Sequence, residues 1–109
     1  MRKETEQPPE VKIFPIARMR QDYTMNGCTG NFWGHVSRNY RARSDSETFK
    51  IVNDAGIILG YVPVEKVNEI TAFINGNDYH PCKGHVNRVY DRTAKKYSYY
   101  GECVIEKII

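Results

Sequence analysis

The residues of this chain best able to perform chemistry are His80, Cys82 and His85, with Cys28 and His35 further upstream. Thiol and imidazole groups bind zinc, and a thiol beside an imidazole can act as a nucleophile with its base. Successive residues of a strand point to opposite faces, so His80 and Cys82 share one face while His85 points to the other. This spacing disfavours a metal site, and no hydrolase, phosphate-loop or zinc-protease motif is present. We therefore expect a protein that is not an enzyme, with no catalytic residues, metal or cofactor.

The three cysteines, Cys28, Cys82 and Cys103, are odd in number and widely spaced, which rules out a full disulfide framework. Cys82 shares a strand face with Val86, and Cys103 shares one with Ile105. We expect both cysteines to lie inside the domain as small hydrophobic residues. The sequence has no apolar run long enough to cross a membrane and no signal-peptide pattern, so it predicts a soluble, cytoplasmic protein with no membrane partner.

Basic residues are concentrated in two segments, although the net charge of the whole chain is only +3. Residues 18–50 contain six basic and three acidic residues, and residues 83–96 contain five basic residues and one acidic residue. The segment between them, which includes the expected helix, is acidic. If the two basic segments lie on one side of the domain, they form a phosphate-facing surface. The alternative is an ordinary solvated face.

Tyrosines are interleaved with these basic residues, a combination that favours binding of single-stranded nucleic acid. An aromatic ring stacks on an unpaired base for about 1 to 3 kcal/mol, while arginine and lysine neutralise the phosphates. Tyrosine is also a good strand former, so most of the eight tyrosines are expected to be structural. The candidate nucleic-acid contacts in the two segments are Arg20, Tyr23, Arg38, Tyr40, Arg41, Arg43, Arg88 and Tyr90.

The elements that must position these residues are mostly strands. A β-hairpin is predicted over residues 49–63, because apolar residues alternate on either side of the turn-forming Asn53 to Gly56 and Pro63 has no N–H to donate. Apolar residues at helical spacing then predict a helix over residues 64–75, with Gly76 as its C-terminal cap.

Period-two alternation predicts the remaining strands. They are expected at residues 11–20, 31–38, 79–90 and 97–108, with a turn at 91–96 and a Gly-rich loop at 26–30. Six short strands with one buried face must curl to remove their edges. The predicted fold is therefore mainly β, a small six-stranded OB-like or SH3-like β-barrel with one main α-helix. The Gly-rich segment is expected to turn Phe32 and Trp33 into the core, an exposed aromatic platform being the alternative.

A single domain is expected over residues 11–109, since this length suffices for one hydrophobic core and is too short for two. Residues 1–10 are rich in charge, contain Pro8 and Pro9, and have no large apolar residue after Met1. They are expected to form a flexible N-terminal segment.

The order of Asp45, an aliphatic strand at 49–51, Gly60-Tyr61-Val62-Pro63 and a helix resembles the HIRAN domain. HIRAN domains are small β-barrel modules of replication-fork remodellers that also stand alone in bacteria and phages. The resemblance spans roughly residues 11–107. The chain departs from the family pattern at Ala42-Arg43-Ser44, where the family has Asn-Pro-Tyr, and at Thr48, where alanine is common.

The resemblance implies a DNA-repair module that reads 3′ ends of single-stranded DNA. Arg20 and Tyr23 occupy the region of the family's first contact element, whose contiguous Arg-Tyr-Tyr is interrupted here by Gln21-Asp22. Asp45 would accept a hydrogen bond from a terminal 3′-hydroxyl or a base edge, its alternative role being an Asx turn cap. Tyr90 would be the aromatic residue of the last hairpin, with Tyr99 or Tyr100 as the alternatives. The phosphate contacts would come from Arg38, Arg41 and Arg43.

The predicted function is non-enzymatic binding of DNA, in single-stranded form, through this basic and aromatic surface. The alternative is a protein-interaction module of a phage or mobile element, whose tyrosine-rich basic face meets an acidic protein partner. The sequence leaves open the oligomeric state and the choice between DNA and RNA.

Overall fold

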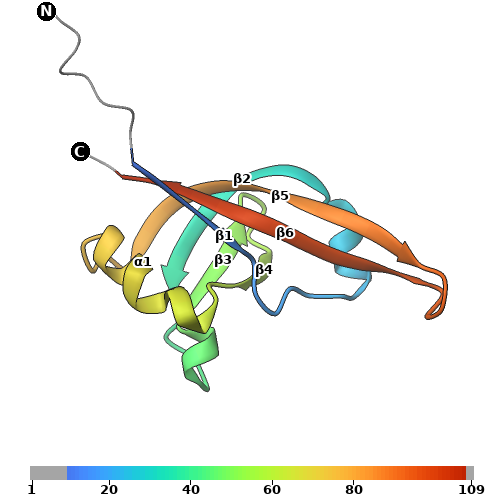
Figure 1. Cartoon of the computed structure of the whole chain (residues 1–109), viewed down its shortest axis with the longest axis horizontal. Coiled ribbons are helices and arrows are strands. Elements are labelled where there is room, and N and C mark those ends of the chain that lie inside the picture. The colour runs from blue at the N-terminus through green and yellow to red at the C-terminus, as the bar shows by residue number, and fades with distance from the viewer. Residues whose placement is uncertain (1–9, 108–109) are drawn as a thin grey trace, which may run out of the picture.

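The computed structural model describes residues 10–107 and has the predicted mainly β fold, with six strands and one α-helix (Figure 1). The predicted flexible segment, residues 1–10, lies outside the described residues except for Glu10, and so does the predicted strand end at Ile108. The elements are β1 (Val11–Pro15), β2 (Gly30–Arg38), β3 (Phe49–Asn53), β4 (Ile58–Tyr61), α1 (Val67–Phe73), β5 (Tyr79–Asp91) and β6 (Lys96–Glu106). Short 3₁₀ helices precede β2, β3 and α1, namely η2 (Tyr23–Gly27), η3 (Asp45–Glu47) and η4 (Val64–Lys66).

The six strands form one antiparallel sheet in the order β1-β6-β5-β2-β3-β4, curled into a half-barrel. An isolated bridge between Ala17 and Tyr61 joins the chain after β1 to β4 at the other edge of the sheet. Its two backbone hydrogen bonds both measure 2.8 Å. Gly60 permits this approach, because a Cβ there would lie 2.5 Å from Cγ2 of Ile16 and 2.6 Å from the carbonyl oxygen of Ala17.

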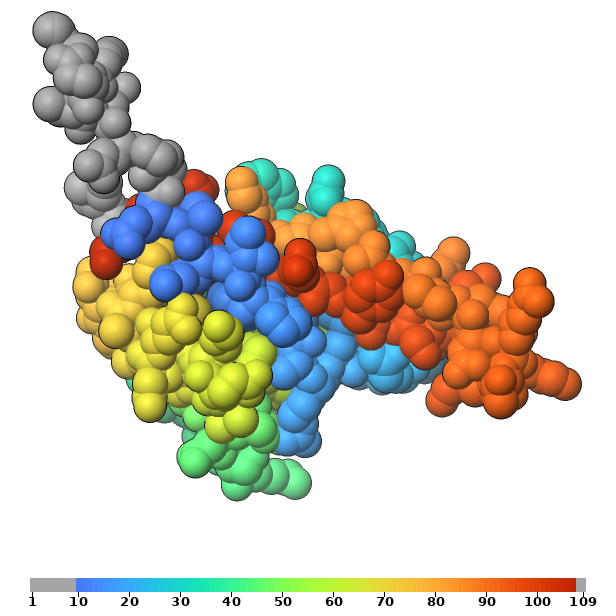
Figure 2. Space-filling model, in the orientation of Figure 1, coloured from blue at the N-terminus to red at the C-terminus, as the bar shows by residue number. Residues whose placement is uncertain are grey.

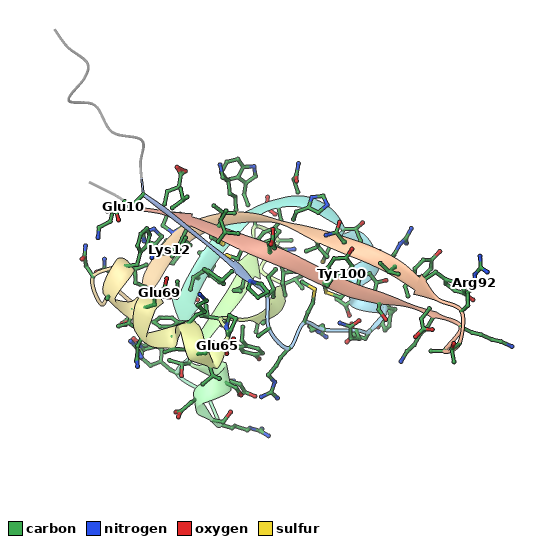
Figure 3. The ribbon with its side chains drawn as sticks, viewed as in Figure 1. Glu10, Lys12, Glu65, Glu69, Arg92 and Tyr100 are labelled. Atoms are coloured by element: carbon green, nitrogen blue, oxygen red, sulfur yellow. The ribbon has the colours of Figure 1, made fainter. Side chains whose placement is uncertain are left out.

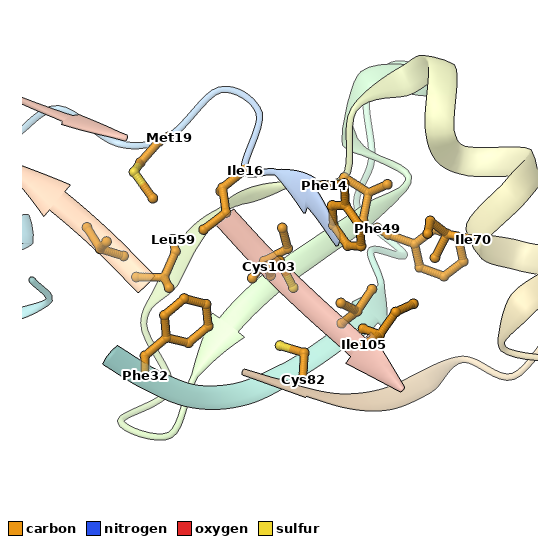
Figure 4. Packing of buried hydrophobic residues seen from close by; sticks show 14 of the residues in the cluster. Phe14, Ile16, Met19, Phe32, Phe49, Leu59, Ile70, Cys82, Cys103 and Ile105 are labelled. Atoms are coloured by element: carbon orange, nitrogen blue, oxygen red, sulfur yellow. The ribbon is translucent and has the colours of Figure 1, made fainter. Parts of the chain in front are cut away.

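The core fills the concave side of this sheet and follows the period-two alternation of the strands (Figure 4). On β6, Tyr99, Gly101, Cys103 and Ile105 are buried, while the residues between them face outward. Cys82 and Cys103 lie inside, as predicted, and Cys28 is buried as well. The concave face is therefore committed to packing, and the loops, the hairpin and the convex face are left for contacts.

The hairpin predicted over residues 49–63 is confirmed as β3 and β4. Asn53 organises its turn, because its side-chain oxygen accepts hydrogen bonds from the N–H groups of Ala55 and Ile57 at 3.0 and 2.9 Å. Gly56 takes a φ of 82° there, a conformation that side chains with a Cβ rarely adopt.

The predicted helix over residues 64–75 is shorter and has two parts, η4 followed by α1. Ile70 and Phe73 of α1 are buried and belong to the hydrophobic core. Figure 1 shows α1 beside one end of the curled sheet. The helix ends before Asn75 and Gly76, which both have positive φ, and the Gly76 N–H bonds to the carbonyl of Thr71. This agrees with the predicted glycine cap.

In the N-terminal half of the chain, the predicted bounds of one strand and one loop are wrong. The strand expected over residues 11–20 ends at Pro15, because Pro15 lacks an N–H and Arg18 turns the chain with a φ of 52°. The segment before β2 contains η2, capped by the Asp22 side chain, which accepts a hydrogen bond from the Thr24 N–H. This cap shortens the predicted Gly-rich loop.

The long hairpin predicted at 79–90 and 97–108 is formed by β5 and β6. Its distal part runs past the ends of both neighbouring strands, because β2 begins opposite Val86 and β1 ends opposite Glu102. Figure 2 shows this hairpin projecting from the body of the molecule. Among residues 10–107, no helix is long and apolar enough to span a membrane.

Candidate nucleic-acid interface

The first candidate surface is a hollow of about 450 Å³ between the end of β2 and η3, called here the loop pocket. Four of the predicted contacts line it, namely Arg38, Tyr40, Arg43 and Asp45, together with Asn39, Ala42, Ser44 and Thr48. Arg41 lies in the same loop, exposed, with its N–H bonded to the Asn39 side chain at 3.2 Å.

Asp78 holds two of these residues in place. Nε of Arg38 lies 3.1 Å from a carboxylate oxygen of Asp78, and the Tyr40 hydroxyl donates to the other oxygen. The hydrogen bonds from Tyr40 and then Arg38 lower the pKa of Asp78, and the same contact to Asp78 raises the pKa of Tyr40. The Arg38 guanidinium also lies 5.0 Å from the centroid of the Phe49 ring. The loop is thus fixed to the sheet through Arg38, whose charge is already shared with Asp78.

Asp45 presents its carboxylate to the loop pocket without a hydrogen bond or ion pair to any of residues 10–107. Its backbone carbonyl accepts from Thr48, and η3 begins after Ser44, which makes no side-chain cap bond. The Asx-cap role considered for Asp45 is therefore absent from this structure, within the part of the chain it describes. The exposed carboxylate can accept a hydrogen bond from a ligand.

Arg18 connects the loop pocket to the segment that follows β1. Its guanidinium lies 2.5 Å from the Ser46 hydroxyl and 3.6 Å from the Glu47 carboxylate. From Arg18 the chain runs along β4, where the Arg20 N–H bonds to the Leu59 carbonyl at 3.2 Å, and then reaches η2. The segment between Arg18 and Tyr23 therefore leads from the loop pocket to a second surface.

This second surface, the hairpin groove, is a hollow of about 220 Å³ between η2 and the β5–β6 hairpin. It is lined by Gln21, Asp22, Tyr23, Asn26, Lys96, Tyr97 and Tyr99. The Tyr99 hydroxyl donates to the side-chain oxygen of Asn26, which fastens η2 to the inner face of β6. Tyr23 is left 85% exposed at the rim of the groove, as a ring available for stacking.

Arg88, Tyr90 and Tyr97 extend the groove along the inner face of the hairpin. Strand register pairs Tyr90 with Tyr97, whose ring centroids lie 5.3 Å apart with an edge-to-face tilt. The Arg88 guanidinium lies 4.3 Å from the centroid of the Tyr97 ring. Tyr97 was missed by the sequence prediction. Pairing the residues on either side of the predicted turn would have identified Tyr97, because it lies directly opposite Tyr90, on the same face of the hairpin.

Arg20 is partly engaged, because its guanidinium lies 3.0 Å from the Asp22 carboxylate. Hydrogen bonds from Thr24 and then Arg20 lower the pKa of Asp22. Arg20 does not line the hairpin groove itself but neutralises the acidic residue that does. The nine predicted residues thus divide into two groups, with Arg20, Tyr23, Arg88 and Tyr90 at or beside the hairpin groove and the other five at the loop pocket.

The acidic helix lies far from the tip of the hairpin but close to the loop pocket, because η3 contacts η4. Glu65 and Glu69 lie on the helical side, and Glu69 pairs with Lys12 at 3.0 Å, whereas Arg92 lies at the far tip of the hairpin (Figure 3). The basic side chains of the hairpin are therefore remote from the acidic helix.

His80 and the three cysteines are buried. Nε2 of His80 lies 2.6 Å from the Glu106 carbonyl oxygen, while His85 is on the opposite, exposed face. A hydrogen bond from Cys82, followed by burial, raises the pKa of the Cys103 thiol. Across residues 10–107, no three His, Cys, Asp or Glu side chains gather as a metal site would require.

Trp33 departs from the prediction that it turns into the core with Phe32. Phe32 is buried on the concave side, but Trp33 follows it on a strand and so points outward, where it is 67% exposed. The expected Gly-rich turn is replaced by regular strand geometry, because β2 begins at Gly30.

Comparisons with protein-family models, curated proteins and solved structures give no match for this chain.

Proposed function

We propose that this protein binds single-stranded DNA, without performing chemistry on it, across the loop pocket and the hairpin groove. The observation that carries the proposal is that Tyr23 and Tyr97, from distant parts of the sequence, line one groove. Tyr97 in turn contacts Arg88 and Tyr90. All three rings are exposed, and exposed aromatic rings beside cations are a means by which proteins hold unpaired bases.

Unpaired cations supply the phosphate contacts in this proposal. Arg41 and Arg43 form no ion pair with any residue between 10 and 107, and Lys96 lines the hairpin groove. A strand passing from the loop pocket to the groove would follow the basic segment from Arg18 to Arg20. Binding should therefore weaken with salt as counterions are released less favourably.

Asp45 gives the loop pocket a means of recognising a strand end. A carboxylate repels phosphate, so its exposed position among arginines suits a hydroxyl or an amino group more than a phosphate. The HIRAN resemblance supports the 3′-hydroxyl as that group. We propose that the 3′ end enters the loop pocket and that the preceding bases reach the hairpin groove.

The test is fluorescence anisotropy at ~150 mM salt with single-stranded and duplex DNA of equal length, each with a free or a phosphate-blocked 3′ end. The proposal expects the free-ended single strand to bind most tightly. Asp45→Asn should remove the preference for the free end while retaining binding. The amide keeps the shape of the side chain but has no negative charge to repel a 3′-phosphate.

Equal, weak binding to all four ligands would overturn the proposal and favour a protein partner. A single-stranded RNA of the same sequence serves as a fifth ligand. Tighter binding to RNA than to DNA would contradict DNA as the ligand. It would still agree with a surface that binds single strands.

A further inference from the structure

The convex face of the sheet has an exposed tryptophan that the nucleic-acid surfaces do not use. Trp33 is the only tryptophan of the chain and is 67% exposed. Hollows of about 350 Å³ and about 250 Å³ lie beside it, the first reaching His85 and the second reaching Glu106. Tryptophan in such a setting is the residue type that most often anchors protein interfaces.

Trp33 is one end of a row that crosses four neighbouring strands. Strand register aligns Trp33 with Lys83, Lys83 with Val104, and Val104 with Ile13. Ile13 is 58% exposed and Val104 is half-buried, so the row has an apolar residue at each end and a cation near its middle. The Lys83 ammonium lies 5.8 Å from the centroid of the Trp33 ring.

Two carboxylates border this row. Glu102 and Glu106 flank Val104 on β6, point to the same convex face and are exposed. Neither forms an ion pair with Lys83 within the described part of the chain. A nucleic acid on this face would meet both carboxylates and be repelled, whereas a protein surface with a cation and apolar residues would be matched.

The row is complementary to a second copy of the same row that runs in the opposite direction. We propose that the partner of this face is a second copy of this chain. In a two-fold contact of the two convex faces, with the axis along the strands between β5 and β6, Trp33 meets Ile13 of the second copy. Lys83 then lies over Val104 of the second copy, between its Glu102 and Glu106. Both members of each contact, the lysine with the glutamates and the tryptophan with the isoleucine, are present on one face. This is the condition for a two-fold homodimer. Sheet-on-sheet packing is also the usual way to cover a second sheet face.

Trp33 fluorescence and sedimentation equilibrium over a wide concentration range test the dimer. We expect association with rising concentration, accompanied by a blue shift of the Trp33 emission. Ile13→Asp should abolish both changes. Three strand spacings of about 4.8 Å separate Ile13 from Trp33 within one chain, so Trp33 can sense this substitution only across the dimer.

Trp33→Ala should weaken association by roughly thirtyfold or more, as is typical for a tryptophan anchor. Lys83→Glu should weaken it as well, and adding Glu102→Lys and Glu106→Lys to that variant should restore it. Val64→Ala, which removes an exposed apolar side chain from η4 and not from the convex face, is the control and should leave association unchanged.

A chain that remains monomeric at several hundred micromolar overturns the proposal, as does association that Ile13→Asp leaves intact. Both outcomes are independent of DNA binding, which uses other surfaces. Trp33→Ala and Ile13→Asp replace exposed side chains, and circular dichroism of each variant establishes that it is folded.

Discussion

The side-chain amide of Gln21 hydrogen-bonds both backbone groups of Tyr99, accepting from its N–H at 2.8 Å and donating to its carbonyl at 2.8 Å. Gln21 thereby takes the place of a strand residue beside β6, just beyond the point where β1 has ended. This contact fixes the loop after β1 against the hairpin. It therefore holds the hairpin groove in its shape.

Gln21→Ala should loosen the groove and lower stability by about 1 to 3 kcal/mol, because two backbone groups of Tyr99 lose their partner. Urea denaturation measures the stability, and anisotropy with single-stranded DNA measures the effect on binding. Gln21→Glu is the informative comparison, since it retains the acceptor for the Tyr99 N–H and places an oxygen against the Tyr99 carbonyl. An unchanged midpoint in both variants would contradict a structural role for Gln21.

Tyr97→Ala should weaken binding of single-stranded DNA by about 5- to 150-fold, the loss expected for one stacked base. Tyr100→Ala is the matched control, because Tyr100 is the same residue type on the opposite face of the same strand, where it is 54% exposed. Its label in Figure 3 marks its position on β6. Equal losses in the two variants would argue against the inner face of the hairpin as the binding surface.

Tyr40→Phe should raise the pKa of Asp78 toward its ordinary value, because the Tyr40 hydroxyl is the largest cause of its lowering. A carboxyl whose pKa is lowered on folding stabilises the fold above its unfolded pKa, and this contribution is lost as pH falls through the folded pKa. Any stability difference between the wild type and Tyr40→Phe should therefore be present near neutral pH and close in acid.

The measurement is an NMR titration of the aspartate side-chain carbons, and Asp22 provides the internal reference. The pKa of Asp22 is lowered by Thr24 and Arg20, at the other surface, so Tyr40→Phe should leave it unchanged. A pKa of Asp78 that is the same in both proteins would show that Tyr40 does not hold it.

Gly60→Ala should destabilise the half-barrel by about 1 to 3 kcal/mol or more, because the new methyl group would press on Ile16 and on the Ala17 backbone. Gly27→Ala is the control, since a Cβ at Gly27 meets nothing within 4 Å and its φ is not positive. Urea denaturation of the two variants measures the difference. Equal stability would mean that the Ala17 to Tyr61 bridge is not a tight closure.

Much of the fold was accessible from the sequence because its signals are local. The alternation along β3 and β4, the turn at Asn53 and Gly56, and the buried cysteines all follow from period-two patterning. The extent of β1 was not accessible from alternation alone, since Pro15 and the left-handed Arg18 end a pattern that otherwise continues.

The site was only partly accessible, since its geometry depends on distant contacts. The sequence identified Tyr23 and Arg88 as candidates, but their approach depends on the register of a long hairpin and on Gln21 reaching Tyr99. Trp33 was misassigned because glycines on both sides suggested an irregular turn, whereas Gly30 and Gly34 belong to a continuous strand. Only pairing with β5 defines which of its faces is outward.

The central claim is that single-stranded DNA lies across the loop pocket and the hairpin groove, and backbone amide chemical-shift mapping tests it most directly. Titrating a single strand with a free 3′ end into ¹⁵N-labelled protein at ~150 mM salt should perturb residues 18–27, 38–48 and 88–99. Trp33 and Lys83, on the convex face, should be unaffected. Shifts concentrated at Trp33 and Lys83, or no shifts at DNA concentrations well above that of the protein, would contradict it.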